Sequence, residues 1–112
     1  MAEKTLRQVD VLRHELKALR FILDAYYSGK LAGEALPPRD DFLSQQSVAI
    51  YDAIVHSKAR AEAEERIRAL DLDDVDIDSF LALSGGHYYT YPALVRQRAR
   101  ALRAGQLTIE AA

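Results

Sequence analysis

A long apolar stripe near the start of the chain most limits what this sequence can fold into. Between about Thr5 and Ser28, apolar side chains recur at intervals of three or four, the spacing that places them on one face of an α-helix. The stripe comprises Leu6, Val9, Leu12, Leu16, Leu19, Leu23 and Tyr26. The basic residues Lys4, Arg7, Arg13, Lys17 and Arg20 lie mostly off it. We therefore predict a long amphipathic first helix.

A loop and a second helical region follow. Glycines and the Pro37–Pro38 pair predict a loop over residues 29–41. Asp40 and Asp41 are suitable N-caps for a helix that starts at Phe42. The Ala-, Glu- and Arg-rich stretch 57–68 also favours helix but carries few large apolar residues. We expect it to be solvated or to contact a partner, and the sequence allows either one helix over 42–70 or two.

The second half of the chain starts with an acidic linker, residues 71–78, which carries five aspartates. We expect its apolar residues Leu72, Val75 and Ile77 to touch the core. Asp76 or Asp78 is expected to cap a short helix of about residues 79–83. Ser84-Gly85-Gly86 ends that helix, and an aromatic loop follows over residues 87–91.

The last helix has clear start and stop signals. Pro92 suits the first helical position, with Thr90 or Tyr91 as the cap, and Gly105 suits the C-terminal stop. Residues 106–112 are predicted to be a frayed tail. Together these segments predict one all-α domain over residues 1–112, a small orthogonal or bundle fold of four to five helices with little or no sheet.

Composition and charge narrow the classes of function. The chain has 112 residues and a net charge of −2, a balance that argues against a dedicated nucleic-acid binder. It has no cysteine, which excludes disulfides and thiolate metal sites. The first residues lack the apolar stretch of a secretory signal, and no window approaches a membrane span. We predict a cytoplasmic protein with no membrane contact.

The usual catalytic and metal-binding patterns do not occur. A calcium loop starting at Asp71 would need glycine at Asp76 and an acid at Ala82. His14, His56 and His87 do not pair with one another at ligand spacing. There is no nucleophile elbow and no phosphate loop. We predict no catalytic residue, no metal and no cofactor. A helical enzyme stays open as a third class, and it would need a deep cleft lined by Arg7, His14 and Glu15.

The best candidate site combines an aromatic loop with an arginine-rich helix. Tyrosine and arginine are favoured anchors of protein interfaces, and they also suit single-stranded nucleic acid. In a third interpretation the tyrosines merely anchor the loop on the core and the arginines form a solvated face. The candidate residues are Tyr88, Tyr89, Tyr91, Arg96, Arg100 and Arg103. A second candidate surface is the stretch 62–68.

Three pieces of the chain also resemble a known family. Ile50-Tyr51-Asp52-Ala53-Ile54 follows Phe42, Gly85-Gly86-His87-Tyr88-Tyr89 forms a glycine turn, and Tyr91-Pro92-Ala93-Leu94-Val95-Arg96 precedes basic residues. In this order they resemble the N-terminal domain of bacterial replicative (DnaB-type) helicases. The helicase-binding C-terminal domain of primases shares that fold.

The resemblance has clear departures. Glu15-Leu16-Lys17-Ala18-Leu19 lacks the glycine of the family's opening helix, an acidic run replaces a further glycine, and no motor domain follows. What the resemblance implies is a helical module for replisome contacts in DNA replication or for self-association, without helicase activity. We expect a non-enzymatic interaction module whose partner is a protein or a second copy in a homodimer. The alternative is a small nucleic-acid-binding or regulatory protein that uses the same tyrosines and arginines.

Overall fold

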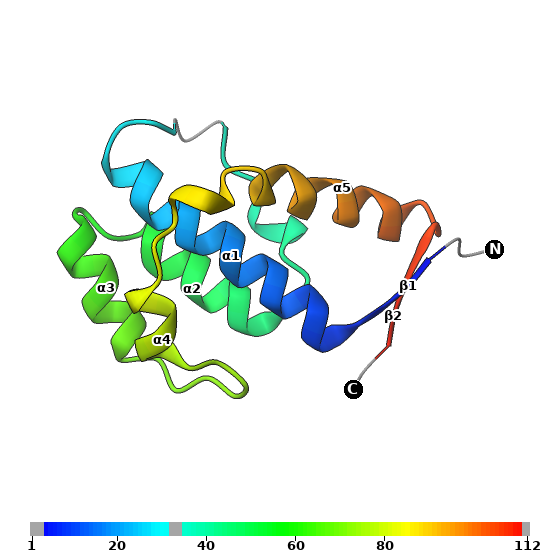
Figure 1. The fold of residues 1–112 in the computed structure, drawn as a ribbon, viewed down its shortest axis with the longest axis horizontal. Coiled ribbons are helices and arrows are strands. Elements are labelled where there is room, and N and C mark those ends of the chain that lie inside the picture. Colours follow the sequence, from blue (N-terminus) through cyan, green and yellow to red (C-terminus); the bar gives the residue numbers. More distant parts are fainter. Residues whose placement is uncertain (1–3, 32–34, 111–112) are drawn as a thin grey trace.

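The computed structural model describes residues 4–31 and 35–110, and the long helix α1 (Gln8–Tyr27) is its spine. Two helices, α2 (Gln45–Val55) and α5 (Tyr91–Arg103), pack along α1, and two shorter ones, α3 (Arg60–Arg68) and α4 (Ile77–Ala82), cover its C-terminal half (Figure 1). The remaining elements are the strand β1 (Lys4–Arg7), the 3-10 helices η2 (Arg39–Asp41) and η3 (Gly86–Tyr88), and the strand β2 (Leu107–Glu110).

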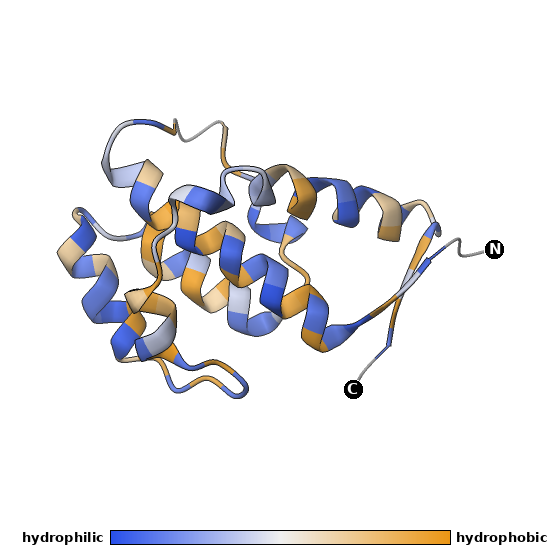
Figure 2. Cartoon of the chain, in the orientation of Figure 1, coloured by the Kyte–Doolittle hydropathy of each residue, from blue (hydrophilic) through white to orange (hydrophobic). Residues whose placement is uncertain are grey.

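The face that α1 buries is wider than the predicted stripe. Because helices pack on it from several sides, Val11, Ala18 and Ile22 are buried together with Leu12, Leu19 and Leu23 of the stripe, whereas Val9 of the stripe is exposed. Figure 2 shows hydrophobic residues where α1 and α2 lie against each other. The expectation that Arg20 lies off the buried face is wrong, because this side chain is only 4% exposed. The helix also starts later than predicted, since residues 4–7 form β1.

The region 42–70 contains two helices, separated at residues 56–59. The prediction that α2 starts at Phe42 with an aspartate cap is wrong. The helix starts at Gln45, Ser44 is its N-cap residue, and Asp40 and Asp41 belong to η2. The expectation that the stretch 57–68 is solvated holds for most of its residues but is wrong for Ala63 in its middle. Ala63 and Ile67 are fully buried in the core cluster, because the small Ala63 side chain lets α3 approach its neighbours closely.

The predicted features of the second half are largely confirmed. Leu72, Val75 and Ile77 pack against the core, as expected. The Asp76 side chain accepts a hydrogen bond from the backbone N–H of Ser79 at 3.1 Å and so caps α4. The helix starts at Ile77, so the acidic linker is shorter than predicted. Pro92 lies in the first turn of α5, and Gly105 follows its end with φ +74°.

The tail contains the main correction to the fold. Residues 107–110 are not frayed but form β2, which pairs in parallel with β1 so that Leu6 lies opposite Ile109. The pairing joins the two ends of the described chain (Figure 1). Residues 111 and 112 of the predicted tail, and residues 32–34 of the predicted loop, lie outside the described residues. The molecule is therefore mostly helical, at 63%, and carries one small parallel sheet.

Candidate interaction surface

The three predicted tyrosines have different environments. Tyr88 and Tyr91 pack edge to face, with ring centroids 5.6 Å apart and an interplanar angle of 84°. The ammonium group of Lys17 on α1 lies 5.7 Å from the Tyr88 centroid and 5.5 Å from that of Tyr91, within the range of cation–π attraction. Tyr89 points away and is 69% exposed. Two tyrosines therefore anchor the loop on α1, while Tyr89 remains available for contacts.

The predicted arginines lie together but on another side of α5. At 100° per residue, Arg96, Arg100 and Arg103 lie roughly 120° to 180° around the helix from Tyr91. They line a shallow hollow of about 430 Å³ together with Leu36, Pro38 and Asp41. The structure therefore gathers the arginines but separates them from the packed tyrosine pair.

Two of these arginines hold the neighbouring chain segment in place. Arg96 donates a hydrogen bond to the carbonyl oxygen of Ala35. Arg103 donates to the carboxylate of the buried Asp41 at 2.7 Å. These contacts connect α5 to residues 35–41, so part of this basic surface has a structural role. Arg100 extends from the same face with its side chain exposed.

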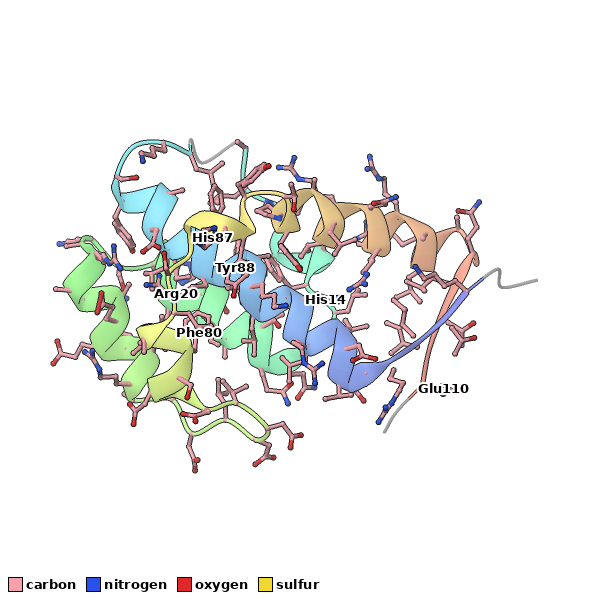
Figure 3. All side chains as sticks on the ribbon, in the orientation of Figure 1. His14, Arg20, Phe80, His87, Tyr88 and Glu110 are labelled. Carbon is pink, nitrogen blue, oxygen red and sulfur yellow. The ribbon has the colours of Figure 1, made fainter. Side chains whose placement is uncertain are left out.

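The sequence reasoning missed an apolar groove between α1 and α4. Its volume is about 390 Å³, and its lining is mostly apolar. Leu16 from α1 and Phe80 from α4 line it, together with Leu83 just beyond α4. Leu83 is 44% exposed, while Phe80 is buried. In Figure 3 the labelled side chains of Phe80, Tyr88 and His14 follow the length of α1. Arg13 and Lys17 also line the groove. Their spacing of four residues, which places both on one side of α1, was the sequence signal that could have indicated this site.

A polar network holds the turn after α4 against α1 and so shapes this groove. Arg20 donates to the carbonyl oxygen of Leu83 at 2.7 Å and to the Asp24 carboxylate at 2.8 Å. Asp24 also accepts the backbone N–H of Gly85 at 3.1 Å and pairs with Arg60 of α3 at 2.7 Å. A Cβ atom on Gly85 would lie 2.5 Å from the Arg20 carbonyl oxygen. Only glycine therefore lets the turn approach α1 this closely.

A helical enzyme would need Arg7, His14 and Glu15 to line one cleft. In the structure these residues lie in separate environments. Glu15 is buried, and its carboxylate accepts the backbone N–H groups of Leu43 at 2.6 Å and Ser44 at 3.1 Å. His14 lies 2.6 Å from Arg98 through its Nδ1 atom, which must accept because a guanidinium group only donates. Burial, then Arg98 and Lys17, lower the pKa of His14. Arg7 belongs to β1 and is exposed.

The second predicted surface, residues 62–68, is covered by local ion pairs. Arg66 pairs with Glu62 at 2.9 Å and donates to the carbonyl oxygen of His56 at 2.8 Å. Arg68 lies 3.7 Å from Glu64 in the same helix. Most charges on this side of α3 are therefore paired within the molecule.

Comparisons of this chain with known proteins gave no match. No family model, no curated protein and no solved structure matches it. Within residues 4–31 and 35–110, no helix is long and apolar enough to cross a membrane. In the same described part of the chain, no three His, Asp or Glu side chains are grouped to hold a metal ion. The functional argument therefore rests on the surface itself.

Proposed function

We propose that this protein is a non-enzymatic interaction module that binds an amphipathic helix of a partner protein in the groove between α1 and α4. One observation carries the proposal: Leu16, Phe80 and the half-exposed Leu83 form a mostly apolar depression on the surface. Grooves of this kind receive the apolar face of a helix through side chains spaced three or four residues apart. Exposed apolar surface beside charged residues is also typical of interaction sites.

The charges at the rim determine the chemistry of the partner. Arg13 and Lys17 lie one turn apart on α1, and the Arg13 side chain is 62% exposed with its nearest acid, Asp10, 3.7 Å away. On the opposite rim, Asp76 uses its carboxylate to bind the N–H and hydroxyl of Ser79. Asp76 keeps its negative charge, because its donors are neutral, so two basic groups and one acidic group line the groove and its net charge is positive. A partner helix with acidic residues along one flank complements it, because like charges there would be repelled.

The resemblance to helicase and primase domains supports an assembly of the replisome kind as the partner. Its three pieces lie on α2, on the Gly85–Gly86 turn and on α5. The turn is the segment that positions Leu83 and Tyr88 beside the groove. We therefore also propose that the protein docks on a larger multiprotein assembly through the face that carries the groove between α1 and α4.

A nucleic-acid partner is the second candidate, and the hollow beside Arg96, Arg100 and Arg103 favours it. Its weakness is geometric. Stacking needs open aromatic faces next to the phosphate-binding groups. Here Tyr88 and Tyr91 pack against each other and against Lys17. Tyr91 also lies on a different side of α5 from the arginines. The protein partner is therefore the better supported proposal.

A titration followed by NMR tests the choice. The ¹⁵N-labelled protein is titrated with a synthetic helical peptide whose leucines recur every three or four residues and whose flank carries glutamates. We expect shift changes centred on Leu16, Phe80 and Leu83. A peptide with lysines in place of the glutamates should bind at least about tenfold more weakly, because it faces Arg13 and Lys17.

Two matched variants serve as controls. Leu83→Asp should abolish peptide binding, whereas Leu102→Asp, at a leucine on α5 that is 36% exposed against 44% for Leu83, should leave it unchanged. A poly-dT oligonucleotide should cause no salt-sensitive shifts at the arginines. Equal binding of both peptides with shifts away from the groove would refute the proposal, and steep salt-dependent binding of the oligonucleotide would favour the second candidate.

A further inference from the structure

The two-stranded sheet lies at the end of the molecule opposite α3 and α4, where β1 contacts α1, β2 contacts α5, and Leu107 is buried (Figure 1). Among the described residues, β1 and β2 pair only with each other, so each has one outer edge of backbone N–H and C=O groups without a strand beside it. Parallel sheets are usually covered on both faces, and two strands alone are marginally stable. Such an edge is a template for another strand.

The two outer edges differ in charge. β1 carries Lys4 and Arg7, both exposed, and basic side chains on an edge strand discourage pairing with other chains. β2 has no basic residue, and its centre is formed by Thr108 and Ile109. Figure 2 shows β2 as hydrophobic beside the more hydrophilic β1. The edge of β2 is therefore the open one.

We propose that two copies of this chain pair antiparallel along their β2 edges, about a two-fold axis that passes between their two Thr108 residues. In this register, Thr108 lies opposite its own copy, and Leu107 of one copy lies opposite Ile109 of the other. Side chains alternate along a strand, so Leu107 and Ile109 share one face with Leu6. The buried Leu107 and the partly buried Ile109 of both copies then lie on the same face of the four-stranded sheet. The same register on β1 would place Lys4 against Leu6, a charge against an apolar residue.

Exposed apolar residues beside the sheet support a second copy as the occupant. Two of the large apolar side chains that are exposed in the described chain lie near the strands: Val9, 39% exposed, at the start of α1, and Leu102, 36% exposed, at the end of α5. A four-stranded sheet across the two-fold axis would bring the same helix ends of both copies together. A symmetric interface uses the same patch twice, which suits a patch that is apolar and uncharged at its centre.

Light scattering coupled to size exclusion tests the proposal through charge. Wild type should be a dimer at high micromolar concentration. Thr108→Lys places two lysines opposite each other at the axis and should weaken the dimer about tenfold. The matched control is Thr5→Lys, because Thr5 is the cross-strand neighbour of Thr108, is equally exposed, and lies away from the axis. That variant should stay dimeric.

A mixing experiment separates a true pairing effect from local damage. Thr108→Lys and Thr108→Glu should each dimerise about tenfold more weakly than wild type, and an equimolar mixture should restore the wild-type affinity because opposite charges then meet at the axis. Circular dichroism verifies that each variant keeps its helices. A monomeric wild type, a dimer insensitive to Thr108→Lys, or equal losses in Thr5→Lys and Thr108→Lys would each overturn the proposal. The outcome is independent of the groove, which lies at the other end of the molecule.

Discussion

The two halves of α1 bury charged groups in different ways. In its C-terminal half, the buried Arg20 is matched by an opposite charge, Asp24, which also pairs with Arg60. In its N-terminal half, the buried Glu15 is held by two backbone N–H groups at the start of α2. One site compensates charge with charge, and the other compensates it with two backbone N–H dipoles in the segment just before α2.

This difference has a measurable consequence in the pKa values. Burial raises the pKa of Glu15 above its usual value of 4.5, and the hydrogen bonds from the backbone N–H groups of Leu43 and Ser44 only partly oppose that rise. The contribution of Glu15 to stability therefore changes with pH over the range in which its carboxylate titrates. The Arg20–Asp24 site instead depends on keeping its two charges together, because an unpaired buried charge is costly. The comparison teaches that burial alone does not define how a charged residue contributes to stability.

The largest effect is expected where the turn meets α1. Gly85→Ala places a Cβ atom 2.5 Å from the carbonyl oxygen of Arg20 and 2.6 Å from the Asp24 carboxylate. The turn must move away and lose its bond to Asp24, so we expect a loss of about 3 kcal/mol in the free energy of unfolding. Urea denaturation measures it. The neighbouring Gly86→Ala, with open space around its Cβ position, should change stability by about 0.5 kcal/mol at most. Equal effects of the two variants would contradict the close packing.

Removing the charge that matches Arg20 should have the next largest effect. Asp24→Asn keeps the shape of the side chain but leaves the buried guanidinium without an anion, so we expect a loss of about 2 kcal/mol. The control is Arg60→Ala, which removes the other partner of Asp24, whose side chain is 45% exposed. This variant should lose about 0.5 kcal/mol. If both variants lost the same amount in thermal and urea denaturation, the pairing with Arg20 would not be the dominant one.

The smallest effect at neutral pH is expected at Glu15, and its signature is a pH dependence. Because the folded protein holds this proton more tightly than the unfolded chain, wild-type stability should fall as pH rises from 4.5 through the folded pKa. Glu15→Gln lacks this dependence and should lie within about 1 kcal/mol of wild type at neutral pH, since one N–H group loses its acceptor while a buried charge is removed. Unfolding curves at several pH values measure the difference, and parallel pH profiles would rule out the raised pKa.

Much of the helical framework follows from local sequence signals. The stripe of α1, the Asp76 cap and the Pro92 and Gly105 signals of α5 all depend on residues within one or two turns, so periodicity and capping rules find them. The burial of Arg20 and Glu15 could not be found in this way. Their partners at residues 83 and 43 are distant in the sequence, and local spacing contains no information about them.

The sheet and the groove were missed for the same physical reason. β1 and β2 have four residues each, so the alternation of Leu107 and Ile109 with polar residues in β2 is too short to predict a strand, and its partner lies at the other end of the chain. The groove arises only when α4 packs on α1. The tyrosine and arginine residues were found as types, but the side of α5 on which each lies depended on that same packing.

The parallel register of β1 and β2 also determines how the molecule responds to tension. Lys4 lies at the same end of the pair as Leu107, and Glu110 lies at the other end beside Arg7. A pull on the chain before Lys4 and after Glu110 therefore slides the strands past each other along their length. In this shear geometry the hydrogen bonds between the strands share the load and must break together, whereas strands pulled apart from one end open bond by bond. This small sheet is thus the element through which a stretching force first reaches the helices.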